Sequence, residues 1–243
     1  MECNGIPAFK CLGTSNAGIT LRSIPAYGST TALRLCGSTA LIRGFMKDII
    51  NRLEKLTTIS KHITLYRNFD KNIIFRNMGK ITGEIDRPYI DFLTITNGAS
   101  ILDYCFMGFK NRSLGLNLYE NNRELWLLDN LLTFKFWGCV SDSIGNSFGY
   151  LDRKNKSGGH YYGFYSINNP NHVYLVASSF SIFMNKFLSQ IEETILENKE
   201  AIGLKNNTWF MDRNKLLEQD EEMTDFLKNK QETEYSLLPS QQA

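Results

Sequence analysis

The sequence predicts an α+β fold, in which helices flank a mixed, mostly antiparallel central sheet and a helical extension follows at the C-terminus. Two patterns support this fold class. Apolar residues recur three or four apart in 46–56 and again in 178–198, which is typical of amphipathic helices. Between these runs, short apolar segments alternate with Gly, Asn, Asp and Ser, as strands joined by turns do: they are 101–109, 114–119, 131–140, 147–151, 160–166 and 173–177.

Three helices are expected in the body of the chain. The first places Ile49, Ile50, Leu53 and Leu56 on one face. A short buried helix follows Pro88 and stops at Asn97-Gly98, since a residue pair that tolerates positive φ commonly ends a helix. The longest begins at an N-cap, Ser178 or Ser179, and repeats apolar residues at helical spacing: Phe180, Phe183, Phe187, Ile191 and Ile195.

Smaller segments are also assigned. Strand-like patches occur at 63–66 and 72–75, and one or two helical turns are expected at 121–130. After Gly203 the chain alternates acidic and basic residues around scattered apolar ones, which indicates one or two peripheral helices. We therefore expect an α+β domain at 46–198 and a charged helical extension with a frayed tail at 199–243.

Residues 1–45 differ from the rest in composition. They are rich in Gly, Ser, Thr, Ala and Cys, and they contain four basic residues but only one acidic residue. Because neither the helix period nor the strand period holds there, we expect a non-native or disordered leader, with the native protein starting at Met46. An organelle transit peptide is the alternative, since such peptides are also Arg-bearing and poor in acid.

Composition excludes several classes of protein. With 42% hydrophobic and 12% aromatic residues, the 243-residue chain can bury a full core. No apolar stretch approaches the roughly 18 residues that a membrane span needs, and no secretory signal is recognisable. Five cysteines without a C-x-x-C pair suit a reducing compartment, so we expect a cytoplasmic protein. A net charge of +2 gives no electrostatic case for nucleic acid.

Three segments in fixed order carry a family resemblance: 89–98, 136–152 and 173–183, which read YIDFLTITNG, FWGCVSDSIGNSFGYLD and VYLVASSFSIF. Together they resemble the SUKH superfamily, over roughly 46–198. The sequence departs from the family pattern at Ala99, where a second Gly is usual. The resemblance implies a mixed sheet with flanking helices. It also implies a non-catalytic role, because bacterial and viral members act as immunity proteins against toxins and fungal members act in cell-wall signalling.

Two patterns could indicate an enzyme. Residues 145–149 match G-x-S-x-G around Ser147, and Asp152 with His160 or His172 follows in the order of an α/β-hydrolase. That mechanism needs a strand-to-helix elbow, whereas this segment reads as a strand entering a turn. Asp142 and Asp152 could act as the acid and base of a glycosidase, but aspartates that flank a hairpin are commonly turn formers. We therefore expect no catalytic residues.

Metal and cofactor sites are not expected either. The candidate ligands do not fall at metal-ligand spacings such as H-x-x-x-H or C-x-x-C, and they are His62, His160, His172, Cys105 and Cys139. The chain also lacks a P-loop or a G-x-G-x-x-G sequence that would cradle phosphates.

A partner-binding surface is predicted on the strands. Aromatic residues crowd the second half of the predicted sheet, and strand alternation should turn some of them outward, where Tyr and Trp are effective interface anchors. A nucleic-acid platform would need more basic neighbours than Arg153, Lys154 and Lys156. The candidate partner-binding residues are Trp137, Asp142, Tyr150, Asp152, Tyr161 and Tyr162.

Three functions remain open at this stage. The first is an immunity-type protein that occludes a protein toxin and performs no chemistry of its own. The second is an intracellular regulatory or scaffolding protein that binds a host factor through the C-terminal extension. A truncation after Asn198 should separate these two, because only the first should survive it. The third is a serine hydrolase that uses Ser147.

Overall fold

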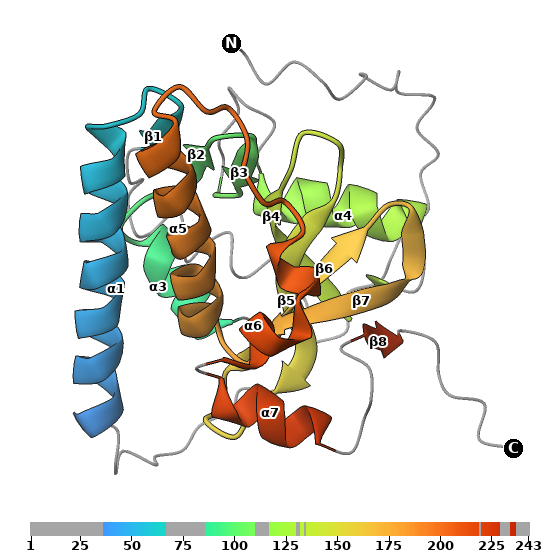
Figure 1. Cartoon of the computed structure of the whole chain (residues 1–243). Coiled ribbons are helices and arrows are strands. Elements are labelled where there is room, and N and C mark those ends of the chain that lie inside the picture. The colour runs from blue at the N-terminus through green and yellow to red at the C-terminus, as the bar shows by residue number, and fades with distance from the viewer. Residues whose placement is uncertain are drawn as a thin grey trace, which may run out of the picture.

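A computed structural model of the chain describes residues 36–66, 86–109, 117–129, 132–133, 135–218, 220–228 and 234–236. Helices and strands are interspersed along the chain, and the predicted α+β fold class is confirmed (Figure 1). In order, the elements are α1 (Cys36–Thr57), β1 (Ile63–Leu65), α3 (Arg87–Leu93), β2 (Ala99–Ile101), β3 (Tyr104–Phe106), α4 (Leu118–Leu128), β4 (Phe136–Ser141), β5 (Ser147–Lys154), β6 (His160–Ser166), β7 (Asn169–Ala177), α5 (Phe180–Glu197), η2 (Trp209–Met211), α6 (Arg213–Leu217), α7 (Glu221–Leu227) and β8 (Glu234–Ser236).

The strands form one eight-stranded sheet in which spatial order follows chain order, from β1 to β8. Every pairing between these strands is antiparallel, so the described sheet is antiparallel rather than mixed. The long central strands β4 to β7 follow one another through short turns, and such turns can only join antiparallel neighbours. A parallel contact occurs as an isolated bridge between Gly108 and Asn117.

Two glycines let the central strands approach their neighbours closely. Gly149 of β5 pairs with Gly138 of β4 on one side and with Gly163 of β6 on the other. A Cβ atom at Gly149 would lie 1.8 Å from the carbonyl oxygen of Trp137, and one at Gly163 would lie 2.2 Å from a methyl group of Val173. A side chain at Gly149 would push the neighbouring backbone away, and one at Gly163 would displace the Val173 side chain.

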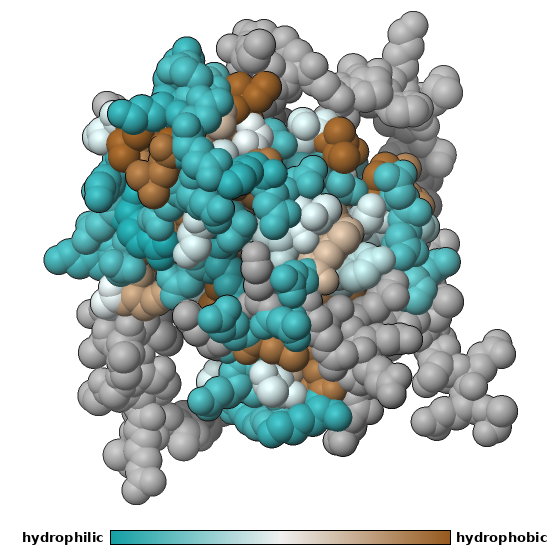
Figure 2. All heavy atoms as spheres, in the orientation of Figure 1, coloured by the Kyte–Doolittle hydropathy of each residue, from teal (hydrophilic) through white to brown (hydrophobic). Residues whose placement is uncertain are grey.

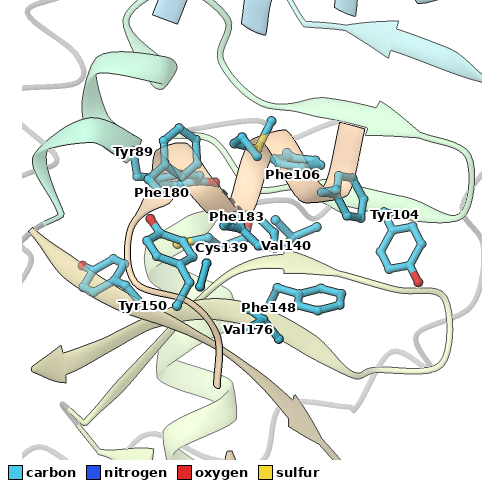
Figure 3. Close-up of a cluster of buried hydrophobic side chains, with 14 of the residues drawn as sticks. Tyr89, Tyr104, Phe106, Cys139, Val140, Phe148, Tyr150, Val176, Phe180 and Phe183 are labelled. Carbon is cyan, nitrogen blue, oxygen red and sulfur yellow. Dashed lines mark hydrogen bonds between the residues drawn. The ribbon is translucent and has the colours of Figure 1, made fainter. Parts of the chain in front are cut away.

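Helices α1, α3 and α5 cover one face of the sheet, on the left of Figure 1. Helix α5 begins at Ser179, whose hydroxyl accepts a hydrogen bond from the Ile182 N–H, as predicted for an N-cap. Its rings pack directly on β5 and β6, with Phe183 5.6 Å from Phe148 and 5.2 Å from Tyr162 between ring centroids. Figure 3 shows this aromatic core, in which Phe180 and Phe183 face Phe148 and Tyr150.

Helix α1 is longer than the sequence predicted. It begins at Cys36 rather than at Met46 and so includes the last ten residues of the expected leader, whereas residues 1–35 lie outside the described part. No proline interrupts 36–46, so the backbone can continue the helix through this segment. On its core side, Ile49 and Leu53 are fully buried, and Arg52 forms two 2.9 Å hydrogen bonds to the Glu192 carboxylate of α5.

Several predicted boundaries need correction. The short helix α3 ends at Leu93, before Asn97-Gly98. The Asn97 side chain bonds to both backbone groups of Phe109 at 2.8 and 2.9 Å. The strand predicted at 114–119 is wrong for 117–119, the part of that range that the structure describes, because Asn117 caps α4 and the next residues belong to the helix. The helical turns expected at 121–130 belong to that helix. The strand patch at 63–66 is confirmed as β1, while 72–75 lies outside the described residues.

The C-terminal extension is part of the folded body. Residues Trp209 and Phe210 of η2 are buried, and their rings lie 6.0 and 5.5 Å from Phe148 of the central sheet. Phe210 also lies 4.1 Å from Phe164. Beyond α7, the short strand β8 pairs with β7 inside the expected frayed tail. Among the described residues, no helix has the length and apolar character needed to cross a lipid bilayer.

Candidate protein-binding surface

Four of the six predicted partner-binding residues lie inside the molecule. Trp137, Tyr150, Tyr161 and Tyr162 are each no more than 5% exposed. Trp137 stacks on Tyr150 at 6.2 Å and meets the ring of Trp126 from α4 edge-on at 4.6 Å. The prediction that strand alternation exposes these four side chains is therefore wrong. Alternation turns side chains outward only where one face of a sheet is bare, and here helices and the C-terminal extension cover them.

A buried hydrogen-bonded cluster uses one of these positions, Tyr162, structurally. The Tyr162 hydroxyl donates to Asp86 at 2.7 Å, and His160 Nδ1 lies 3.3 Å from the other Asp86 oxygen. Asp86 also caps α3 by accepting from the Tyr89 N–H. All are at most 3% exposed, and burial raises the pKa of Tyr162 well above its ordinary value. The cluster joins α3 to β6.

Cys139 lies beside this cluster and is buried. Burial raises the pKa of its thiol well above the ordinary value, and the negative charge of Asp86 raises it further. Because the thiolate is the reactive form of cysteine, this environment favours an unreactive structural thiol.

The G-x-S-x-G segment has the geometry of a strand. Ser147 opens β5 opposite Ser141 and Tyr165, whereas His160 pairs with Lys154 at the other end of the same strand. Seven residues at about 3.3 Å each separate those ends by roughly 23 Å. His172 precedes Val173, the residue that faces Tyr165 across the next strand pair, so its side chain points to the opposite face from Ser147. Neither histidine is placed to activate Ser147.

The two predicted aspartates also lie far apart. The Asp142 N–H donates to the Asn146 carbonyl at the start of β5, and Asp152 lies six residues further along that strand. At about 3.3 Å per residue, this spacing is roughly 20 Å, which exceeds the separation used by glycosidase carboxyl pairs. Asp152 is exposed, and Asp142 is half-buried in a turn.

Asp142 builds the turn between β4 and β5. Its Oδ1 accepts from the backbone N–H groups of Ile144 at 3.0 Å and Asn146 at 2.9 Å, and its Oδ2 accepts from the Asn146 side-chain amide at 2.8 Å. Gly145 adopts a φ of +94°, which the turn requires. The expectation that this aspartate forms a turn is therefore confirmed, and its carboxylate is occupied within the chain.

Asn146 links this turn to the neighbouring turn between β6 and β7. Its side-chain oxygen accepts from the Ser166 hydroxyl at 3.1 Å and from the Ile167 N–H at 3.3 Å. The Asn146 side chain is buried, with 8% exposure. One buried side chain therefore bonds to both turns, and these bonds restrict how far the residues at their tips can move apart.

Exposed apolar side chains gather on this rigid end of the sheet. A Cβ at Gly145 would lie 3.9 Å from Ile167 Cδ1, so the two turns touch. The end of α4 is fastened nearby, because the Tyr165 hydroxyl donates to Asp129 at 3.2 Å. Figure 2 shows hydrophobic atoms at the upper right, over these elements. We call Ile144 and Ile167, which are 69% and 54% exposed, the tip surface.

The opposite end of β5 carries a second braced turn. Asn155 accepts from the Gly159 N–H at 2.8 Å and donates to the Ser178 carbonyl at 2.8 Å, which fastens the β5–β6 turn to the start of α5. A hollow of about 420 Å³ lies here, lined by residues that include Ser157, Ser179 and Glu222. Unlike the tip surface, this end is partly covered by α7.

The candidate metal ligands do not assemble. Among the residues that the structure describes, no group of three His, Cys, Asp or Glu side chains is arranged to hold a metal ion. The absence of a metal and of a cofactor stays a prediction.

No family model matches the chain, and no curated protein matches it. The likeness to the SUKH superfamily therefore rests on the three sequence segments and stays a prediction.

Sequence reasoning missed the isoleucines of the tip surface. The prediction was based on aromatic residues in the strands, whereas the exposed apolar residues lie in the turns. Both Asp142-Ser-Ile-Gly-Asn146 and Ser166-Ile-Asn-Asn169 place one large apolar residue among turn-forming polar ones. Such a residue has no strand face through which to reach the core, so it is presented to solvent.

Proposed function

We propose that the protein binds another protein through the tip surface and performs no chemistry of its own. The observation that carries this proposal is the presentation of Ile144 and Ile167 on two turns locked together by Asn146. Large apolar side chains on a rigid support are effective interface anchors, because little conformational freedom is lost when they are buried by a partner.

The partner we propose is a protein toxin, which the tip surface would occlude. The family resemblance supports this choice. Its first segment forms α3 and the loop to Gly98, the second forms the β4–β5 hairpin, and the third carries β7 into α5. The second segment includes Asp142, Ile144 and Asn146, so the part of the chain that resembles immunity proteins contributes one of the two tip-surface residues and the asparagine that links the turns.

Co-expression with the C-terminal domain of the protein that the neighbouring gene encodes tests the proposal. Cell survival and co-purification are scored for the full chain and for the double variant Ile144→Asp/Ile167→Asp. We expect rescue and a stable complex with the unchanged chain. We expect affinity to fall about 30-fold or more in the double variant, since each carboxylate would be buried without a partner.

A matched control keeps this experiment specific. Leu196 is 83% exposed near the end of α5, so Leu196→Asp makes the same chemical change away from the tip surface and should leave survival unaffected. Cell death without a complex in the presence of the unchanged chain would reject the toxin as partner. Equal loss of binding in the control would reject the tip surface as the contact.

The regulatory alternative needs a different test from truncation after Asn198. That truncation would remove Trp209 and Phe210, and it would uncover Phe148 and Phe164 in the core. Loss of binding would then report unfolding rather than a lost contact. Single substitutions on the exposed side of α7, such as Glu221→Lys, probe the extension without opening the core.

A further inference from the structure

Helix α7 is a short acidic helix that depends on its contacts with the body. It has seven residues, far fewer than an isolated helix needs to be stable in water. Its apolar side buries Met223 and Leu227 at 0% and 2% exposure, while Glu221, Glu222 and Asp225 give it three negative charges. The helix is therefore amphipathic, and its structure requires the surface that receives it.

The receiving surface is the β5–β6 hairpin, and its polar contacts are charge-complementary. The Lys156 ammonium lies 3.0 Å from the Asp225 carboxylate. The Lys156 backbone N–H donates to Glu222, and the Tyr161 hydroxyl lies 3.4 Å from the same carboxylate. Two acidic residues three positions apart are thus held by one lysine and one tyrosine.

The aromatic side chain of Phe226 completes the contact. Its ring lies 5.1 Å from the ring of Tyr161, and the Arg153 guanidinium lies 4.3 Å above it. Arg153 and Lys156 belong to the basic cluster noted in the sequence, which had no assigned role. Here that cluster recognises an acidic helix that carries an aromatic residue.

The polar contacts between α7 and the hairpin are exposed to solvent, whereas the apolar contacts of Met223 and Leu227 are buried. The side chains of Lys156 and Asp225 are 70% and 42% exposed, so water and salt screen their attraction. The hollow beside Glu222 and Ser179 shows that α7 does not fill the space between the hairpin and α5. In Figure 1, α7 lies at the foot of the molecule, and in Figure 2 apolar atoms reach the surface there between hydrophilic ones.

We propose that the hairpin surface formed by Arg153, Lys156 and Tyr161 is a binding site for an acidic amphipathic helix of a partner protein, and that α7 is its intrachain occupant. The contacts of Glu222, Asp225 and Phe226 define the ligand chemistry: two carboxylates at positions i and i+3 and an aromatic ring at i+4. This site lies at the opposite end of β5 from the tip surface and does not depend on the proposed function.

A labelled peptide with the sequence of residues 218–229 tests the site. Its binding is measured by fluorescence anisotropy with the full chain and with the full-chain variant Asp225→Lys/Phe226→Asp, which releases the intrachain helix. We expect at least tenfold tighter peptide binding to the released variant, because its site is vacant. Adding Lys156→Glu to that variant should abolish binding, and a scrambled peptide should not bind.

A second measurement covers the case in which the released variant fails to fold. Hydrogen exchange of the α7 amides in the unchanged chain should quicken when excess peptide competes for the hairpin, while the amides of β5 and β6 stay protected. The proposal is overturned if the peptide leaves α7 exchange unchanged at saturating concentration. It is also overturned if the folded released variant binds the scrambled peptide equally well. The Ile144→Asp/Ile167→Asp variant should keep peptide binding, which separates this site from the tip surface.

Discussion

The two ends of strand β5 are built alike and finished differently. At one end Asn146 joins the β4–β5 turn to the β6–β7 turn, and at the other Asn155 joins the β5–β6 turn to α5. The first turn presents Ile144 to solvent, whereas the second is covered by α7. A buried asparagine therefore makes a turn rigid but does not decide its use. Whether the turn is available to a partner depends on which other segments of the chain cover it.

High pH should unfold the protein at both ends of β5, and this is the largest effect that we expect. Burial, then the charge of Asp129, raises the pKa of Tyr165 beside the tip surface to about 12, and burial raises that of Tyr150 and Tyr162 well above the usual range. A raised tyrosine pKa stabilises the fold below the ordinary value near 10, and this contribution is lost as pH rises toward the folded value.

We therefore expect cooperative unfolding as pH rises from about 10 to beyond 12, followed by circular dichroism and phenolate absorbance together. Tyr165→Phe should move the start of this transition to higher pH. Phenolate formation near the ordinary pKa with no change in structure would contradict the burial of these rings.

Asp220→Ala should strongly lower the stability of the end of β5 that α7 covers. Its carboxylate accepts from the Ser178 N–H at 2.9 Å and the Met223 N–H at 3.1 Å, and it lies 3.5 Å from the Lys186 ammonium. Removing it leaves buried donors unsatisfied, so we expect a loss of about 3 kcal/mol in the free energy of unfolding, measured in urea. Asp152→Ala, which changes an exposed carboxylate, should cost less than about 0.5 kcal/mol.

The two asparagines give a direct comparison of the ends. Asn155→Ala frees two buried or half-buried backbone groups held at 2.8 Å, so we expect a loss of about 2 kcal/mol. Asn146→Ala loses longer bonds to Ser166 and Ile167 and a 2.8 Å bond to the half-buried Asp142 carboxylate, whose oxygen water can reach, so about 1 kcal/mol is expected.

For partner affinity we expect the opposite order, with the larger loss from the substitution of Asn146. Asn146→Ala should weaken the partner complex because it unlocks the tip surface, while Asn155→Ala should leave that complex intact at temperatures where both variants are folded. Equal effects of the two substitutions on partner affinity would break the comparison.

The smallest effect is expected for the exposed charges on α7. Hydrogen bonds from Lys228 and Lys156 lower the pKa of Asp225 to about 2. A lowered carboxyl pKa stabilises the folded state above the ordinary value of about 3.9, and this contribution is lost as pH falls through the folded value. Because Lys228 caps α7 itself, only the contribution of Lys156 stabilises docking. Hydrogen exchange of the α7 amides should thus quicken slightly between about pH 4 and pH 2 relative to β5 amides, and Asp225→Asn should remove this pH dependence.

Periodicity predicted the elements that pack by their own pattern. Helix α5 begins at Ser179 and buries Phe183 and Phe187, because a run of rings at helical spacing leaves few alternatives. The tip surface escaped prediction because it depends on pairing between turns. Ile144 and Ile167 lie 23 residues apart in sequence and meet only through the register of β5 with β6 and through Asn146. The burial of Tyr161 likewise follows from a segment some 60 residues away.

The stacking of Trp209 and Phe210 on Phe148 and Phe164 also orders events during synthesis. The four central strands leave the ribosome well before η2, so two large rings wait without their final cover while the chain is still growing. A nascent chain in this state exposes hydrophobic aromatic surface, and such surface is prone to aggregate and to bind chaperones. Slowing translation between Asn198 and Trp209 should therefore lower the yield of folded protein, even though the finished molecule is unchanged.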